Sequence, residues 1–298
     1  MSKSILITGS NGLLGQKLVH LFKEKNNVIA SSKGSCLISN QSDFIYHSLD
    51  ITDEEAIFET FEKYKPDAVI NTAAMTNVDG CEDQKELCDK INVRAVEYLS
   101  KACEQYDTHL IHISTDFIFD GENGPYSEDD IANPLSYYGL SKWKSEKVLQ
   151  DSSCKWAILR TIILYGTAEN LQRNNIVLWG RKALKEGQTL NIIDDQFRSP
   201  TLAEDLAQAC RLVVEKQATG IYNASGKDIM SIYEMVERMA DFYQCDKSQI
   251  NRISSSTLNQ KAKRPPKTGF LLNKIINQLG YVPHSFEEGL ALLEKQIN

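Results

Sequence analysis

Proline, low-complexity segments and paired cysteine motifs are scarce or absent in this 298-residue chain. With only 7 prolines and 42% hydrophobic residues, the composition is that of a folded globular protein. The seven cysteines are dispersed, odd in number and never in CxxC spacing, which argues against a disulfide framework and against a zinc site. They are Cys36, Cys81, Cys88, Cys103, Cys154, Cys210 and Cys245. We therefore expect a reduced, cytoplasmic protein.

Long apolar runs and stripes of basic charge are also missing. No apolar segment approaches the length that spans a membrane, and the apolar part of MSKSILITG (1–9) is too short for a signal peptide. The formal net charge is −7, and the basic residues are scattered. This pattern argues against a membrane or a nucleic acid as the main partner, but it leaves room for a local basic pocket that binds phosphate.

The first two-thirds of the chain contains a regular alternation of short β-branched segments and helical patterns. Strands are predicted at 5–8, 27–31, 43–47, 67–71, 109–114 and 156–160. Helices are predicted at 13–25, 53–64, 85–106 and 137–150. Such alternation is typical of an α/β fold with a Rossmann-type, doubly wound parallel sheet that is covered by helices on both faces.

After Gly166 the alternation becomes irregular. The predicted elements are a helix at 174–186, a strand at 190–193, a helix at 202–215, a strand at 220–225, and a mostly helical remainder from about 228 with a loop at 261–270. We expect a smaller, mostly helical C-terminal region packed against one edge of the large sheet.

A glycine-rich loop, TGSNGLLGQ (8–16), follows the first predicted strand and opens the first helix. Gly9, Gly12 and Gly15 permit a tight turn, close backbone approach to a pyrophosphate, and tight packing of helix on strand. Amides at the helix N-terminus, from Asn11 to Leu14, then face the phosphates. The position directly after an N-terminal strand favours dinucleotide binding over a purely structural turn.

The residues near the end of the second strand bear on the choice of cofactor. Folds that prefer NAD usually carry an acid there, about 20 residues after the glycines. This chain has Ser31, Ser32 and Lys33 instead, and two hydroxyls with an ammonium would hold a 2′-phosphate. NADP(H) is therefore favoured over NAD(H). The alternative is that Lys33 is simply a solvated loop residue.

The segment LDITDEEA (49–56) combines a helix start with a ligand candidate. Thr52 and Glu55 fit a capping box, and Asp53 suits the first helical turn. Asp50, at the carboxyl end of a strand, is left free to reach a ligand.

The stretch NPLSYYGLSK (133–142) offers a catalytic pair. Tyr138 and Lys142 have i, i+4 spacing and would be neighbours on one helix face. An ammonium beside a phenol lowers the phenol pKa, so the pair can exchange a proton with a carbonyl oxygen. A second copy, Tyr243–Lys247, has the same spacing with no glycine loop nearby, and we interpret it as a solvated helix face.

The context separates the two copies. Thr115, in STDFIFDG (114–121), ends a predicted strand, which is where ligands of open α/β sheets bind. At this point the chain resembles the dTDP-4-dehydrorhamnose reductase family of extended short-chain dehydrogenase/reductases. The segments that carry the resemblance are TGSNGLLGQ, LDITD, NTAAMTNVDGCE, INV, STDFIFDG, NPLSYYGLSK, LRTIILYG, DDQFRSPT, GIYNASG and RPPKTGFL, spread over residues 8–271.

The resemblance implies a role for each matching position. Thr115 would hydrogen-bond the substrate carbonyl, Tyr138 would deliver the proton, and Lys142 would bind the nicotinamide ribose. The implied cofactor contacts are Gly9, Asn11, Gly12, Leu13, Leu14, Gly15, Ser31, Ser32, Lys33, Asp50, Ile51, Ala73, Ala74, Thr76, Tyr138 and Lys142. Asn92 could be either a structural contact or a site residue. Tyr137 is expected to pack or to line the pocket.

The resemblance also implies a substrate set, which comprises Thr115, Asp116, Ile163, Gln196, Arg198 and Arg264. Arg198 replaces a glycine that is frequent in the family and suits a nucleotide-sugar diphosphate, the alternative being a surface salt bridge. Ile163 replaces an aromatic residue, usually Trp, so the resemblance leaves the identity of the sugar open. Asp116 and Asp120 also suit turns. Gln16-Lys17 replaces an acidic metal ligand of some members, and the five histidines show no metal spacing, so no metal is predicted.

We thus predict a nucleotide-binding domain of residues 1–167 and 199–227, with a substrate-binding region of residues 168–198 and 228–298. The predicted activity is NADP(H)-dependent reduction of the C4 keto group of a nucleotide-linked 6-deoxy sugar, such as dTDP-4-dehydro-L-rhamnose. The expected assembly is a homodimer. The alternatives are a non-catalytic NADP-binding regulatory subunit, and a nucleotide-sugar epimerase or dehydratase, since Asp116 follows Thr115 as in dehydratases.

Overall fold

The computed structural model describes residues 2–171 and 174–297. Seven parallel strands form the large sheet, in the order β11-β6-β5-β4-β1-β2-β3. They are β1 (Ser4–Thr8), β2 (Asn27–Ser32), β3 (Ile45–Ser48), β4 (Ala68–Asn71), β5 (His109–Thr115), β6 (Trp156–Thr161) and β11 (Gly220–Asn223). The predicted doubly wound α/β fold is confirmed, and each predicted strand of this sheet is present within two residues of its expected bounds.

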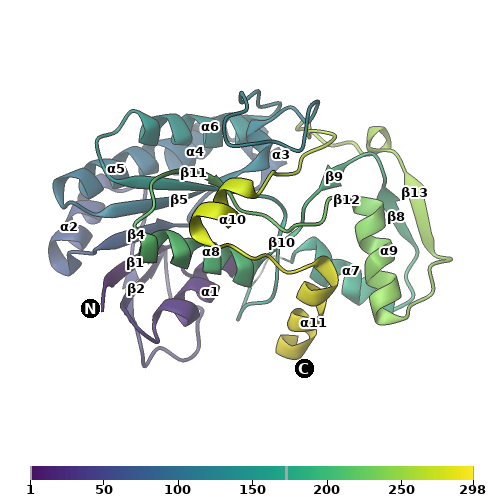
Figure 1. Cartoon of the computed structure of the whole chain (residues 1–298), viewed down its shortest axis with the longest axis horizontal. Helices are drawn as coiled ribbons and strands as arrows, with labels where there is room; N and C mark the ends of the chain where they lie inside the picture. Colours follow the sequence, from purple (N-terminus) through teal and green to yellow (C-terminus); the bar gives the residue numbers. More distant parts are fainter. Residues whose placement is uncertain (1, 172–173, 298) are drawn as a thin grey trace.

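Helices cover both faces of this sheet, as Figure 1 shows. On one face, α1 (Leu13–Phe22), α8 (Ala203–Lys216) and α10 (Asn273–Leu279) share a core with alternate strand residues such as Ile5 and Ile7. On the other face, α2 (Glu54–Tyr64), α5 (Ala95–Gln105) and α6 (Tyr137–Gln150) pack with the intervening residues such as Leu6. A strand buried on both faces reads as a continuous apolar run, which is why ILI (5–7) identified β1.

The predicted helix at 85–106 is interrupted. It comprises α4 (Lys85–Asp89), a π-helical turn (Lys90–Arg94) and α5, and it is preceded by the short α3 (Val78–Asp83). The cap of α2 also differs from the expectation, because the side chain of Asp53 rather than Thr52 accepts the Ala56 N–H. Thr52 instead donates its hydroxyl to Asp50.

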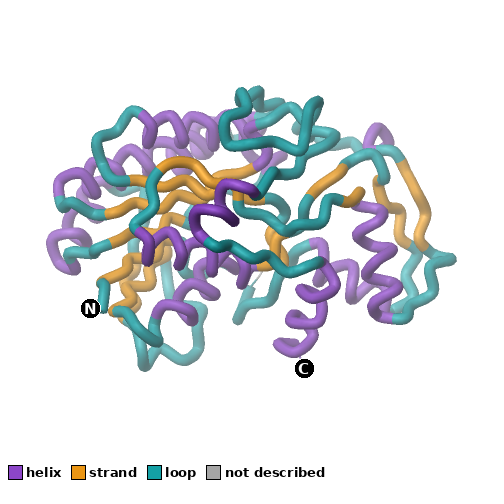
Figure 2. The backbone as a smooth tube through the Cα atoms, in the orientation of Figure 1, coloured by secondary structure: helices purple, strands orange, loops and turns teal. Residues whose placement is uncertain are grey.

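The C-terminal region has its own core, built around α7 (Ile176–Lys185), α9 (Ile232–Tyr243) and α11 (Phe286–Ile297). These elements lie to the right of and below the large sheet in Figure 2. Two strands, β8 (Leu190–Ile193) and β13 (Ile250–Ile253), pair in parallel at its edge. Strand β13 departs from the mostly helical pattern expected from about residue 228. Helix α10 packs against α8 and β11 of the large sheet.

Short strand pairs and turns complete the structure. Strand β7 (Leu164–Tyr165) pairs with β10 (Thr201–Leu202), and β9 (Phe197–Arg198) pairs with β12 (Met230–Ser231). Two 3-10 turns occur at Asp116–Ile118 and Ser255–Thr257. Within the part of the chain that the structure describes, no helix is long and apolar enough to cross a membrane.

Candidate active site

The carboxyl ends of the central strands open onto a cavity of about 770 Å³. Residues that follow β1 and residues that follow β4 both line it, so it lies where the strand order changes direction and where open α/β sheets bind ligands. Predicted site residues in its lining are Gly12, Leu13, Leu14, Gly15, Ala74, Thr76, Thr115, Asp116, Tyr138, Lys142, Ile163 and Arg264. Predicted site residues outside the lining are Gly9, Asn11, Ser31, Ser32, Lys33, Asp50, Ile51, Ala73, Gln196 and Arg198.

The glycine loop has the geometry of a phosphate cradle. Gly9 adopts φ +69°, and a Cβ there would lie 2.7 Å from the backbone nitrogen of Ala73. A Cβ on Gly15 would collide with the carbonyl oxygen of Gly9, so helix α1 packs on the loop more closely than any side chain allows. No side chain caps α1 at Gly12. The N-terminal amides of α1 therefore face the cavity and suit an anionic pyrophosphate.

Asn11 braces this loop. Its backbone N–H donates to the Ser32 hydroxyl at 3.0 Å, and its side chain bonds the Ser35 carbonyl and the Leu37 N–H at 2.8 and 2.9 Å. The loop after β1 is thus tied to the loop after β2. A contact from Asn11 to a cofactor stays a prediction.

The structure separates the three residues expected to hold a 2′-phosphate. Ser31 is fully buried, so its hydroxyl lies in the sheet and not at the surface. Lys33 is exposed, and its ammonium lies 2.8 Å from a carboxylate oxygen of Asp50. The hydrogen bond from Lys33 lowers the pKa of Asp50 to about 2. The Asp50 carboxylate binds Lys33 and Thr52, and its contact with a ligand stays a prediction.

Tyr138 is the second residue of helix α6 and lies at the cavity wall, one turn before Lys142. Burial raises the pKa of the Tyr138 phenol, the side chain of Thr115 interacts with it and lowers that pKa, and Asp116 raises it. The phenol is therefore protonated at neutral pH, as a proton donor must be. Tyr137, by contrast, donates its hydroxyl to Asp89 at 2.9 Å and is absent from the cavity lining.

Lys142 is buried, and its amine contacts a residue that the sequence reading did not connect with it. Lys142 Nζ lies 2.9 Å from His112 Nε2. Burial lowers the pKa of Lys142 to about 8, while Glu146 opposes this shift. His112 lies within β5 and is buried, and its ring faces the Lys142 amine.

Helix α6 is held against the sheet by polar contacts as well as by packing. The Ser136 side chain caps its N-terminus, and a Cβ on Gly139 would collide with the Phe117 carbonyl oxygen. Further along α6, Glu146 forms a buried ion pair with Arg160 of β6, with N–O distances of 2.7 to 3.3 Å. Tyr138, Lys142 and Glu146 follow at four-residue spacing and so share one helix face.

Asn92 has a structural role. It lies in the π-helical turn, where its amide bonds both the N–H and the carbonyl of Met75 at 2.8 and 3.1 Å and donates to the Ser141 hydroxyl at 3.0 Å. The loop after β4 is thereby fixed to α6. Of the two interpretations of Asn92, the structure favours the structural contact.

Asp116 and Arg198 form part of a buried polar cluster beneath the cavity. The Thr268 hydroxyl donates to Asp116 at 2.5 Å, and Arg198 Nε lies 3.8 Å from the same carboxylate. Arg198 also donates to the Pro265 carbonyl at 2.7 Å and to the Gln196 side chain at 3.4 Å. The surface salt bridge considered for Arg198 is wrong, because its side chain is 2% exposed and holds the 265–268 backbone in place.

Arg264 and Ile163 approach the cavity from the C-terminal side. Arg264 lines the cavity and makes a two-point ion pair with Asp79 of α3, at 2.7 and 3.2 Å. Ile163 lines it as well and holds φ +32°, a region that β-branched residues rarely adopt. Such strain is often found at ligand sites.

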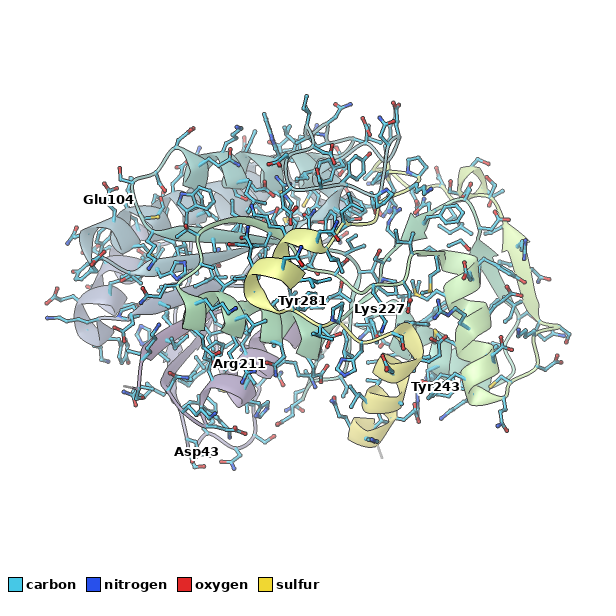
Figure 3. The ribbon with its side chains drawn as sticks, viewed as in Figure 1. Asp43, Glu104, Arg211, Lys227, Tyr243 and Tyr281 are labelled. Carbon is cyan, nitrogen blue, oxygen red and sulfur yellow. The ribbon has the colours of Figure 1, made fainter. Side chains whose placement is uncertain are left out.

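The second Tyr–Lys copy is not a helix face. Helix α9 ends at Tyr243, which lies in the C-terminal region away from the large sheet (Figure 3). Its ring contacts the ammonium of Lys185, 4.9 Å from the ring centroid, whereas Lys247 pairs with Asp241. The interpretation as a solvated helix face is therefore wrong, although the pair is indeed remote from the cavity.

Comparison with known proteins agrees with this geometry. Residues 3–298 match the family described as RmlD substrate binding domain. The chain belongs to that family. This RmlD-family chain is 31% identical over 300 residues to a dTDP-4-dehydrorhamnose reductase of Aggregatibacter actinomycetemcomitans, covering 96% of each. It is also 31% identical over 260 residues to methionine adenosyltransferase 2 subunit beta of Rattus norvegicus, covering 86% of this chain and 76% of the relative.

A solved structure of an RmlD-family relative extends this likeness to the whole molecule. The dTDP-4-dehydrorhamnose reductase of Bacillus anthracis in complex with NADP superposes with a TM-score of 0.85 at 25% identity, covering 99% of this chain and 100% of that one. The resemblance noted in the sequence is thus confirmed as family membership.

Lys17 of this RmlD-family chain stands where some members carry an acidic metal ligand, and it pairs with other side chains. Its ammonium lies 2.8 Å from Glu204 and 2.7 Å from the Gln296 side chain, so a cationic group already neutralises that carboxylate. Within residues 2–171 and 174–297, no group of three or more His, Cys, Asp or Glu side chains could hold a metal ion.

Proposed function

We propose that this protein is an NADP(H)-dependent oxidoreductase that reduces the C4 keto group of a nucleotide-linked 6-deoxy sugar. The preferred substrate is dTDP-4-dehydro-L-rhamnose and the product dTDP-L-rhamnose. The observation that carries the proposal is the convergence of Thr115, Tyr138 and Lys142 on a cavity that also contains the N-terminus of the glycine-loop helix.

The residues present fit a nicotinamide dinucleotide. The N-terminus of α1 has no side-chain cap and suits its pyrophosphate, and Gly12 to Gly15 line the cavity there. Lys33, at the end of β2, is the candidate for a 2′-phosphate. When bound, such a cofactor supplies a hydride to the carbonyl carbon.

The side chains of the cavity supply the proton that the sugar oxygen gains in the reduction. Tyr138 carries its proton at neutral pH and gives it to the sugar oxygen as negative charge develops there. The Lys142 ammonium stabilises the resulting phenolate, which regains a proton from solvent. Thr115 now donates its hydroxyl to Asp116 at 3.1 Å, and rotation about χ1 would turn that donor toward the substrate oxygen.

The finer assignments extend this proposal. Arg264 is the preferred contact for the diphosphate, because it lines the cavity, whereas Gln196 and Arg198 shape the wall behind it. Ile163 would lie beside the sugar. A cytoplasmic location fits the seven cysteines, all free thiols within the described residues. The product would serve the synthesis of cell-surface polysaccharides, and the homodimer stays a prediction.

The test mixes the protein with NADPH and a dTDP-4-keto-6-deoxy sugar and follows the absorbance of NADPH. We expect turnover that falls by about 10²–10⁴-fold in a Tyr138→Phe variant, with NADPH binding retained. Tyr243→Phe is the matched control and should keep its rate. Absence of turnover with several such sugars, or full activity of Tyr138→Phe, would contradict the proposal.

The second candidate is a regulatory NADP-binding subunit, which the likeness to methionine adenosyltransferase subunit beta favours. Thr115, Tyr138 and Lys142 are all in place in the cavity, and this supports the enzyme instead. Tight NADPH binding without turnover, together with a stoichiometric enzyme partner in a pull-down, would reverse the choice. An epimerase or dehydratase is disfavoured because the Asp116 carboxylate is bound to Thr268 and Thr115.

A further inference from the structure

The amine of Lys142 has an unusual environment for a buried cation. Its side chain is almost fully buried, yet Lys142 makes no ion pair within residues 2–171 and 174–297. The nearest carboxylate on its own helix face, Glu146, is occupied by Arg160 and by the Ser114 hydroxyl. Within the same described residues, Lys142 Nζ has one hydrogen-bond partner, the Nε2 atom of His112. A buried ammonium depends strongly on such a partner, because its remaining interactions with water are lost.

His112 is held firmly in turn. It lies in the middle of β5 on the face that α6 covers, and its side chain is 1% exposed. Its Nδ1 lies 3.1 Å from the side-chain amide of Asn71 on β4, and that amide contacts the Thr8 hydroxyl on β1 at 2.6 Å. Three adjacent strands of the sheet therefore fix the ring against which the amine rests.

We propose that His112 is a positioning residue for the proposed reduction, a neutral imidazole whose Nε2 accepts a hydrogen bond from the Lys142 ammonium and aims it at the cavity. The inference rests on the proposed function for its catalytic consequence, but the contact itself can be measured without turnover. Nothing in the Tyr–Lys motif or in the glycine loop implies it.

The neighbours of the ring are consistent with this role. Ser145 Oγ lies 3.1 Å from Nε2, but its hydroxyl donates to the Lys142 carbonyl at 2.6 Å and so leaves Nε2 to the amine. With Nε2 as acceptor, the ring proton sits on Nδ1. The structure places the amide nitrogen of Asn71 at Nδ1 and its amide oxygen at the Thr8 hydroxyl, so this tautomer requires the Asn71 amide to be turned by 180°. The other tautomer would put an N–H against the amine and would require neutral lysine.

The charges around the pair favour a neutral ring beside a charged lysine. Burial and the Lys142 ammonium hold the pKa of His112 well below its usual value. The groups that act on Lys142 are Glu146 on α6 and the Cys88 thiol on α4, and both raise the pKa that burial lowers to about 8. Below that pH the amine is charged and needs an acceptor, which His112 supplies.

Two substitutions of His112 test the contacts of its two ring nitrogens separately. Glutamine places a side-chain oxygen near the position of Nε2, and asparagine places one near Nδ1. His112→Gln should therefore keep the contact with Lys142, whereas His112→Asn should lose it and keep the contact with Asn71. Loss of a hydrogen bond to a charged group is expected to lower the pKa of Lys142 by about one unit and kcat/KM by about tenfold near pH 8.

The experiment measures kcat/KM for sugar reduction against pH, together with thermal unfolding of each variant. We expect the alkaline limb of His112→Asn to move about one unit toward acid, with His112→Gln within about twofold of the original protein. His109→Gln is the matched control, because His109 is buried in the same strand on the opposite face. If both His112 variants lose kcat/KM equally and the alkaline limbs of their pH profiles do not move, His112 is only a packing residue and the proposal is overturned.

A second measurement does not require activity. Nitrogen NMR of ¹⁵N-histidine-labelled protein should show His112 with Nδ1 protonated and Nε2 unprotonated at pH 7. The substitution Lys142→Met should raise the pKa of His112. A proton on Nε2 at that pH, or a titration unaffected by Lys142→Met, would overturn the contact. If these signals appear but no sugar is reduced, the proposed function fails while the contact between His112 and Lys142 is upheld.

Discussion

Tyr138 and Tyr243 are both followed by a lysine four residues later, and their surroundings make them different chemical groups. Tyr138 stands at a cavity wall beside Thr115, with a buried ammonium one turn away. Tyr243 ends its helix, so Lys247 continues in another direction and binds Asp241. Reactivity at the residue scale is thus set by the partners that the fold supplies, and not by spacing alone.

Lys33 gives a residue-scale prediction about the cofactor. Lys33→Ala should weaken NADPH binding by roughly fivefold and leave NADH binding within about twofold, because an exposed ammonium adds only a modest, solvent-screened attraction to a phosphate. Asp50→Asn should instead strengthen NADPH binding, since it releases Lys33 from the carboxylate 2.8 Å away. Fluorescence titrations with both cofactors at two salt concentrations measure this, because added salt should shrink the difference.

The control for Lys33 is Lys101→Ala, which removes another exposed lysine, one of α5 that pairs with Glu54 of α2. It should leave both affinities unchanged. Equal weakening of NADPH and NADH by Lys33→Ala would show that Lys33 does not read the 2′-phosphate.

At the scale of elements, the buried pair of Glu146 and Arg160 anchors α6 to β6. Removing one partner of such a pair leaves an uncompensated buried charge, so Glu146→Leu should lower the free energy of unfolding by about 3–5 kcal/mol. The double variant Glu146→Leu/Arg160→Met should recover much of that loss. Urea unfolding measures both. Glu54→Ala, which breaks an exposed pair, should cost less than about 1 kcal/mol.

A double variant as unstable as the single one would show that Glu146 stabilises α6 by contacts other than its charge. The hydroxyl of Ser114 is the contact to consider then, because it donates to Glu146 at 2.5 Å.

The sequence predicted elements well where a local pattern determines them. The apolar run of β1, the glycines before α1 and the serine cap of α6 are all visible in the chain. It failed where contacts between distant residues decide. The π-helical turn at Lys90–Arg94 lets Asn92 reach Met75, and β13 is a strand because β8 lies beside it. Neither the π-helical turn nor the pairing of β13 with β8 is marked by a pattern in the residues around it.

The site shows the same limit. Spacing identified Thr115, Tyr138 and Lys142, and a turn motif identified the glycines. The partners of these residues could not be read from spacing: His112 meets Lys142 across 30 residues of chain, and Thr268 meets Asp116 across 152. The burial of Arg198 beneath the 265–268 backbone likewise follows from the tertiary fold.

At the scale of the whole molecule, the cavity depends on a loop that crosses from the C-terminal region to the large sheet. Residues 261–268 reach α3, where Arg264 binds Asp79 at two points and Lys261 binds Asp83. Of these four side chains, Arg264 lines the cavity. This loop therefore forms a wall of the cavity that requires both the large sheet and the C-terminal region.

Arg264 gives the prediction at this scale. Arg264→Met should raise the KM of the nucleotide sugar by about tenfold or more, because it removes a charge-assisted contact to the diphosphate and releases the wall from α3. The Kd of NADPH should stay within about twofold, since the hydrogen bonds of Arg264 go to Asp79 and Ala262 and not to the glycine loop. Lys261→Met breaks the neighbouring, more exposed pair and should change neither value. Steady-state kinetics and cofactor titration separate the outcomes: equal effects of both variants on KM would assign the role to the loop as a whole, and a loss of NADPH affinity in Arg264→Met would show that the wall belongs to the cofactor site.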